Sequence, residues 1–219
     1  MHAYATQLIN FLAAVLLMLS FAMLSQRRIL SLIHLYTLQG VALVLANLIL
    51  GFVTHDAHLY VSAGLTLVLK VGVIPWILYR LVRRLDVQAD VEPLINIPTT
   101  LLIGIVLVIV AFNVAAPISQ LATSVARGAL GIALACVLLS FMAMITRAKA
   151  IPQVLGFLSM ENGLFFAATA ATNGMPMIVE LGIGLDVLVG ILILGVFMFQ
   201  IREQFDSLDI HHLEKLKDE

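Results

Sequence analysis

The sequence predicts an all-α, polytopic membrane protein with seven transmembrane helices, its N-terminus outside and its C-terminus in the cytoplasm. Of the 219 residues, 62% are hydrophobic and only 11% are charged, and the mean hydropathy is +1.08. A soluble domain has about 25% charged residues, because it must present a wet surface. This composition excludes a soluble enzyme and a secreted disulfide scaffold. The net charge of −1 also excludes a nucleic-acid binder.

Seven apolar stretches have roughly the 20 residues that a helix needs to cross a bilayer. In order, they are residues 3–24, 29–51, 59–81, 97–116, 126–146, 151–172 and 177–200. Proline supports these limits, because its missing N–H costs little in the first turn of a helix. Pro98, Pro152 and Pro176 stand near expected helix starts, and Pro117 follows the fourth stretch.

Basic residues predict the orientation, because cytoplasmic loops are enriched in Lys and Arg. Those that follow the odd-numbered stretches are Arg27, Arg28, Arg80, Arg83, Arg84, Arg147, Lys149, Arg202, Lys215 and Lys217. The opposite side has only Arg127. The first stretch has its arginines after it, the reverse of a cleavable signal peptide, so we expect it to stay as a helix.

The chain is expected to form a single membrane domain over residues 1–219, with two further features. Residues 203–219 mix apolar and charged side chains, which predicts either a short amphipathic docking segment or a solvated cytoplasmic tail. Residues 27–92 and 147–216 resemble each other at an offset of 123, which aligns Gln39-Gly40 with Asn162-Gly163. Both begin after a basic cluster, so they would be parallel repeats.

Ionisable and amide side chains lie near the middle of four predicted helices. They are Gln39 in the second, Lys70 in the third, Glu161 and Asn162 in the sixth and Asp186 in the seventh. A charged residue at a helix centre costs about 2.5–3.5 kcal/mol on insertion, so we expect these side chains to face the bundle interior or a partner subunit. Lys70 either pairs with a carboxylate as structural glue, or these groups exchange protons with a water chain.

The charges of Lys70, Glu161 and Asp186 sum to −1 if all three ionise. Burial disfavours charged forms, so one proton shared by the two carboxylates makes the set neutral, and we expect that proton to be mobile. Thr66 lies one turn before Lys70, and Pro75 takes the helical donor away from the nearby carbonyl of Val71. A kink beside Lys70 is therefore predicted.

Two further ionisable residues are candidates for a proton path. His34 lies in the second stretch, nearer the cytoplasmic end, where it is either a proton relay or a hydrogen-bonded packing residue. Glu180 lies at the outer end of the seventh stretch, one turn into the expected helix. It either complements the helix dipole or serves as a proton exit.

Four strings, in order, carry a resemblance to a known family. They are Leu69-Lys70-Val71 with Pro75, Met160-Glu161-Asn162-Gly163, Val179-Glu180-Leu181-Gly182-Ile183-Gly184-Leu185-Asp186 and Leu208-Asp209-Ile210 with Leu213 and Leu216-Lys217. Over nearly the whole chain they resemble hydrogenase-4 component E. That family is a membrane subunit of formate hydrogenlyase-type nickel–iron hydrogenases, which are related to respiratory complex I.

The last third of the chain also resembles the smallest antiporter-like subunit of complex I, the K or 4L chain. It is similar as well to the C subunit of multisubunit sodium/proton antiporters. Those chains have two intramembrane glutamates, and Asp186 followed by Gly190 matches the second. At the first, Gly156 and Asn162 fit the family pattern, but the acid position holds Leu158. Here the acid, Glu161, comes one turn later.

The resemblance implies a non-catalytic subunit in the membrane arm of a complex-I-like redox complex. It would be an accessory subunit of an oxidoreductase that helps conduct protons and links antiporter-like subunits in a bacterial or archaeal cytoplasmic membrane. The nickel–iron site and iron–sulfur clusters would belong to partner subunits, including a soluble hydrogenase-type arm, with no cofactor in this chain. The single Cys136 agrees, because one cysteine cannot supply a cluster ligand set.

Two alternatives stay open. The chain could belong to a cation/proton antiporter that has no redox partner, or it could be a scaffold of the membrane arm without conduction. The presence or absence of a neighbouring gene for a nickel–iron hydrogenase large subunit would distinguish the redox complex from the antiporter. The substitutions Lys70→Ala, Glu161→Gln and Asp186→Asn would separate the second, by their effects on assembly and on proton pumping.

Overall fold

A computed structural model describes residues 2–55, 57–84, 94–119 and 124–172, together with Gly184, Leu188 and Gly195. The elements are α1 (His2–Ser25), α2 (Ile29–Thr54), α3 (Ala57–Thr66), the π-helix η1 (Leu67–Val73), α4 (Ile74–Arg84), α5 (Ile97–Ser119), α6 (Ser124–Ile145) and α7 (Ala150–Thr172). These described residues contain no strand. The predicted all-α class is thereby confirmed for this part of the chain.

The first six predicted spans coincide with helices, the third of them being α3, η1 and α4 in succession. Four helical stretches in the described residues are long and apolar enough to cross a membrane. They are Tyr4–Ser25, Ile29–Thr54, Ala57–Arg83 and Ile97–Pro117, with mean hydropathies of 2.3, 1.9, 1.9 and 2.5. The seventh predicted span and the tail at 203–219 lie outside the described residues, apart from the three helical residues named above.

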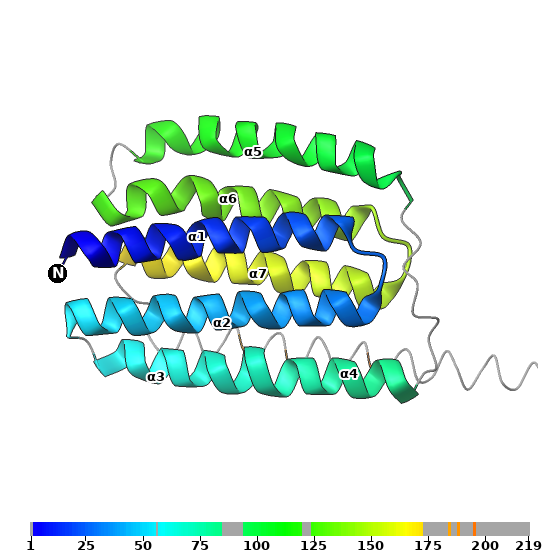
Figure 1. Ribbon diagram of the computed structural model, residues 1–219, viewed down its shortest axis with the longest axis horizontal. Coiled ribbons are helices and arrows are strands. Elements are labelled where there is room, and N and C mark those ends of the chain that lie inside the picture. Colours follow the sequence, from blue (N-terminus) through cyan, green and yellow to red (C-terminus); the bar gives the residue numbers. More distant parts are fainter. Residues whose placement is uncertain are drawn as a thin grey trace, which may run out of the picture.

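The helices lie side by side and alternate in direction along the chain (Figure 1). The centre of the bundle holds α1, α2, α6 and α7, with α1 packed on α2 and α6, and α7 packed on α6 and α2. One edge is α5, which packs mainly on α6. The opposite edge is the continuous α3–η1–α4 helix, which packs on α2.

Glycines let α7 approach α6 closely. A Cβ atom added at Gly156 would lie 2.8 Å from Cγ of Met144, and one added at Gly163 would lie 3.2 Å from Cβ of Cys136. The two glycines are seven residues apart, so about two helical turns place them on the same face of α7. Cys136 itself is 3% exposed and packs as the small hydrophobe that the sequence predicts.

Two apolar clusters of the core lie one on each side of the middle of the bundle. The first cluster includes Leu12, Leu16, Ala42, Ala46, Leu59, Cys136, Phe165 and Phe166. The second cluster includes Met23, Ile29, Leu32, Ile33, Tyr36, Ile74, Leu78, Ile151, Leu155 and Leu158. The buried polar residues Gln39, Lys70, Glu161 and Asn162 fall between these clusters along α2, η1 and α7. They form a polar layer across the middle of the bundle.

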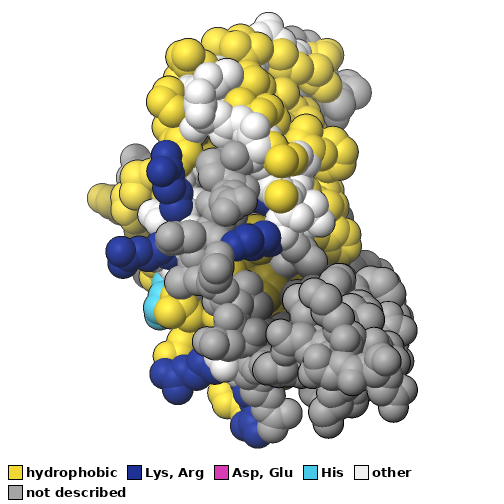
Figure 2. Space-filling view, turned by 90° about the vertical axis from the view of Figure 1, so that its right-hand side faces the viewer, with side chains coloured by type: hydrophobic (Ala, Val, Ile, Leu, Met, Phe, Trp, Pro, Cys, Tyr) yellow, Lys and Arg dark blue, Asp and Glu magenta, His cyan; other side chains and the backbone are white. Residues whose placement is uncertain are grey.

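Basic side chains gather at one end of the bundle, which Figure 2 views directly. They come from the α1–α2 connection, the last turns of α4 and the α6–α7 connection: Arg27, Arg28, Arg80, Arg83, Arg147 and Lys149. No carboxylate of the described residues appears on this face (Figure 2). We call it the basic end, and it is the end where α1 and α4 finish and where α2 and α7 begin.

Candidate functional site

The π-helix η1 places Lys70 in the polar layer. The N–H of Ile74 bonds to the carbonyl of Leu69, five residues earlier, which is the wider turn of a π-helix. Pro75 follows at once, and its ring removes one donor from the helical ladder. The sequence predicts a kink at this point. The structure shows the wider turns of a π-helix in the residues that precede the proline. Lys70 lies in the middle of this segment and is 5% exposed.

Lys70 forms a buried ion pair with Glu161 of α7. Its Nζ lies 3.0 Å from Oε1 of Glu161, and the two side chains are 7% and 8% exposed. The same Nζ lies 5.0 Å from the centre of the Phe165 ring, one turn further along α7, in a cation–π arrangement. Of the two carboxylates that the sequence offers Lys70, the structure therefore shows Glu161. Asp186 lies outside the described residues, as does Glu180.

A chain of side-chain hydrogen bonds runs from Lys70 across three further helices. Lys70 donates to Oδ1 of Asn162 at 3.0 Å, and Nδ2 of Asn162 donates to Oε1 of Gln39 at 3.3 Å. Nε2 of Gln39 donates to the Ser20 hydroxyl at 3.1 Å, and that hydroxyl donates to the Leu16 carbonyl at 3.0 Å. The chain thus joins η1, α7, α2 and α1.

The direction of this amide chain is dictated by Lys70. An ammonium group has donors and no acceptor, so Asn162 must turn its oxygen toward Lys70. Its NH₂ group then faces Gln39, which must in turn present its oxygen to Asn162 and its NH₂ group to Ser20. Each amide dipole therefore has its negative end toward the ammonium, which favours the charged form of Lys70. Gln39 and Asn162 are thereby suited to stabilising the charge on Lys70.

A cavity of about 20 Å³ adjoins the ion pair and can hold one water molecule. Its lining consists of Leu65, Thr66, Leu69, Lys70, Glu161, Phe165 and Gly184. Thr66 and Lys70 thus share a face, as their spacing predicts. Gly184 comes from the predicted seventh span, and a Cβ atom there would lie only 2.9 Å from Cδ1 of Leu69. The chain therefore returns to the ion pair at Gly184.

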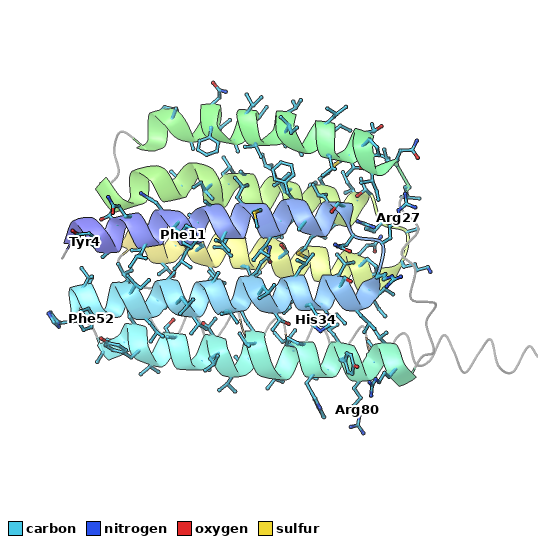
Figure 3. The ribbon with its side chains drawn as sticks, viewed as in Figure 1. Tyr4, Phe11, Arg27, His34, Phe52 and Arg80 are labelled. Carbon is cyan, nitrogen blue, oxygen red and sulfur yellow. The ribbon has the colours of Figure 1, made fainter. Side chains whose placement is uncertain are left out.

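His34 is not brought into this cluster. It lies on α2 (Figure 3) and is exposed, whereas Gln39 on the same helix is 1% exposed. The structure thus collects four of the sequence-predicted site residues, Gln39, Lys70, Glu161 and Asn162. Among the described residues, no group of three or more His, Cys, Asp or Glu side chains is arranged to hold a metal ion.

Two residues at the site, Tyr36 and Ser20, are not among those that the sequence predicts. Tyr36 is fully buried one turn before Gln39, and its hydroxyl has no hydrogen-bond partner among the described residues. Ser20 accepts the last amide hydrogen bond of the chain from Gln39. Neither is ionised at neutral pH, so a search for charges in apolar segments passes over both. The hydroxyl group that each residue carries within a predicted span is the sequence feature that could have pointed to them.

The burial of Arg147 is not predicted either, because in the sequence it is one of several basic residues that predict the orientation. It is only 2% exposed, and its Nη2 donates to the carbonyls of Met23 and Leu24 at 3.2 and 2.7 Å. These carbonyls belong to the last turn of α1, where a helix lacks internal donors and favours a positive charge. Burial lowers the pKa of the Arg147 guanidinium. Arg147 therefore fastens the α6–α7 connection to the end of α1.

Comparisons with known proteins place the chain in a family. No family model matches it, and no solved structure matches it. The uncharacterized protein Rv0085 of Mycobacterium tuberculosis is 34% identical to it over 212 residues, which are 96% of this chain and 96% of that protein. Such an identity over nearly the full length of both chains shows common descent. The chain belongs to the same family as the Mycobacterium tuberculosis protein Rv0085.

Proposed function

We propose that this chain is a non-catalytic subunit in the membrane arm of a complex-I-like redox complex, of the formate hydrogenlyase or hydrogenase-4 type. In this role it helps to conduct protons and links antiporter-like subunits. It crosses the bacterial or archaeal cytoplasmic membrane seven times, with the N-terminus outside. The basic end then faces the cytoplasm, in keeping with the gathering of arginines there. Nickel–iron and iron–sulfur chemistry belongs to partner subunits.

The observation that carries this proposal is the buried ion pair of Lys70 and Glu161 in the polar layer. Their 3.0 Å contact lies between two apolar clusters, at the middle of α7 and of the α3–η1–α4 helix. A buried ion pair is often no more stabilising than apolar residues of the same size. Intramembrane charges are therefore candidates for function, and proton transfer is a use that a lysine–carboxylate pair serves.

The geometry supports different roles for Lys70 and Glu161. Lys70 is held as a cation by its amide chain, so Glu161 is the group suited to take up and release a proton. A proton that reaches Glu161 neutralises the carboxylate and weakens its attraction for Lys70. The cavity beside the pair can admit the water molecule that delivers or removes that proton. Asp186, two residues after Gly184 in the sequence, is the proposed next acceptor.

Purification from the native membrane in mild detergent tests the assignment to a redox complex. We expect a nickel–iron hydrogenase-type large subunit and antiporter-like membrane subunits to co-purify with this chain. Antiporter subunits without any redox subunit would instead support the cation/proton antiporter. Recovery of the chain alone under conditions that preserve other membrane complexes would contradict both assignments.

One observation favours a second candidate, a scaffold of the membrane arm without conduction. The ion pair and amide chain join η1, α7, α2 and α1 by direct side-chain bonds, as structural glue would. In that case, Glu161→Gln and Gln39→Leu should both weaken assembly. If conduction is the function, the Glu161→Gln complex that still assembles should no longer move protons.

A further inference from the structure

The contacts around Lys70 hold this side of the Lys70–Glu161 pair in place. On the lysine side, the ammonium meets a carboxylate oxygen, an amide oxygen and a ring face, from Glu161, Asn162 and Phe165. Each amide behind Asn162 is oriented by the one before it, and the chain ends on the Leu16 carbonyl. Moving Lys70 therefore breaks a run of bonds, so the lysine side is fixed.

Tyr36 offers a hydrogen-bond donor on the other side of the pair. Its side chain is 0% exposed, and its hydroxyl has no hydrogen-bond partner among the described residues. Tyr36 packs in the same apolar cluster as Leu158, which lies about one turn before Glu161 on α7. Tyr36 precedes Gln39 by about one turn of α2, and Gln39 bonds to Asn162, the residue next to Glu161. One face of α2 thus presents both side chains toward the polar layer.

Among the described residues, Tyr36 is surrounded mainly by apolar side chains, and Glu161 is an acceptor that suits its hydroxyl. Tyr36 packs in the second apolar cluster with side chains such as Ile33, Ile74 and Leu155. A buried hydroxyl without a partner is destabilising, because it loses its hydrogen bonds to water and gains none in return. A carboxylate is an acceptor with about four lone-pair positions, so it has room for donors in addition to Lys70. A polar pair too far apart for a direct bond is commonly joined by one water molecule.

We propose that Tyr36 is a positioning residue for Glu161, its hydroxyl donating to the Glu161 carboxylate through one bridging water molecule. Lys70 holds the carboxylate from η1, and Tyr36 holds it from α2 on the side of the basic end, where α2 begins. The hydrogen bond stands on the geometry alone. Its use as a proton step between the basic end and Glu161 rests on the proposed function.

Thermal unfolding of the full chain in detergent tests the bond through the direction in which Tyr36→Phe changes Tm. Tyr36→Phe removes only the hydroxyl, and Tyr60→Phe is the matched control, because Tyr60 is 45% exposed. In the native sequence we expect Tyr36→Phe to lower Tm. In the background Lys70→Met/Glu161→Leu, where the hydroxyl has no carboxylate, we expect Tyr36→Phe to raise Tm. A rise or no change in the native sequence overturns the proposal, as does an equal fall in both backgrounds.

Infrared spectroscopy gives a second readout that does not depend on the apolar background being stable. The carboxylate stretching bands of Glu161 are assigned by their loss in Glu161→Gln. We expect Tyr36→Phe to shift these bands and Tyr60→Phe to leave them in place. Unshifted bands in Tyr36→Phe overturn the proposal. Neither measurement follows transport, so either outcome is separate from the success or failure of the proposed function.

Discussion

The Nζ of Lys70 and the Oε1 of Glu161 lie 3.0 Å apart in the interior of the bundle, on helices that are far apart in the sequence. A π-helix beside Pro75 positions the lysine, and the middle of α7 positions the carboxylate. Asn162, next to the carboxylate, turns its oxygen to the same ammonium and passes the polarity on through Gln39 to Ser20. One charge thereby organises the buried polar side chains of four elements.

Removing one member of the ion pair should destabilise the protein more than removing both. Lys70→Met leaves Glu161 as an uncompensated buried charge, and Glu161→Leu does the same to Lys70, at a cost of about 3–5 kcal/mol each. The double variant Lys70→Met/Glu161→Leu should recover most of that loss, because no buried charge is left. Thermal unfolding in detergent measures the cycle. Additive losses in the double variant would mean that the pair does not act as a unit.

The amide chain should make Gln39 important for stability although it is uncharged. Gln39→Leu leaves the NH₂ group of Asn162 and the Ser20 hydroxyl each short of a partner, and one unsatisfied buried group costs about 1–3 kcal/mol. Gln7→Leu on α1 is the control, because Gln7 is exposed. Unfolding in detergent should separate the two variants clearly. Equal stability of both would contradict the hydrogen-bond chain.

The close contact of α6 and α7 should make Gly156 sensitive to a single methyl group. In Gly156→Ala the new Cβ would lie 2.8 Å from Cγ of Met144 and 3.2 Å from the Ser140 carbonyl oxygen, so we expect a loss of about 1–3 kcal/mol. Gly64→Ala on α3 is the matched control, since nothing lies within 4 Å of its Cβ position. Alanine favours helix by up to about 1 kcal/mol, so the control should unfold at the same or a higher temperature. A tolerated Gly156→Ala would contradict the packing.

Arg147 should matter for stability although it lies in a connection between helices. Arg147→Gln removes the charged donor from the carbonyls of Met23 and Leu24, and we expect a loss of about 1.5–3 kcal/mol. The lowered pKa of Arg147 still leaves it charged at ordinary pH, so the loss should not change with pH. Arg28→Gln, at an exposed basic residue of the same end, should change stability by less than about 0.5 kcal/mol. Similar losses of stability in both variants would show that Arg147 contributes only its positive charge and not its hydrogen bonds.

The helices could be predicted from the sequence, because apolar runs of bilayer length are bounded by arginine and proline. The pairing of Lys70 with Glu161 could not, since it depends on how α7 is rotated about its axis, and that is set by packing at residues such as Gly156 and Gly163. Arg147 shows a related limit. Its charge is visible in the sequence, but its burial depends on where α1 ends.

Redox-driven proton movement into inverted membrane vesicles is the most direct test of the central claim, that Glu161 carries protons beside a fixed Lys70. Vesicles with Glu161→Gln are compared with Glu161→Asp, which keeps a titratable group, after co-purification has shown that each complex is assembled. We expect Glu161→Gln to lower proton movement at least about tenfold, as for the loss of a proton-transfer group, and Glu161→Asp to restore part of it. An assembled Glu161→Gln complex that moves protons like the native one would contradict the account.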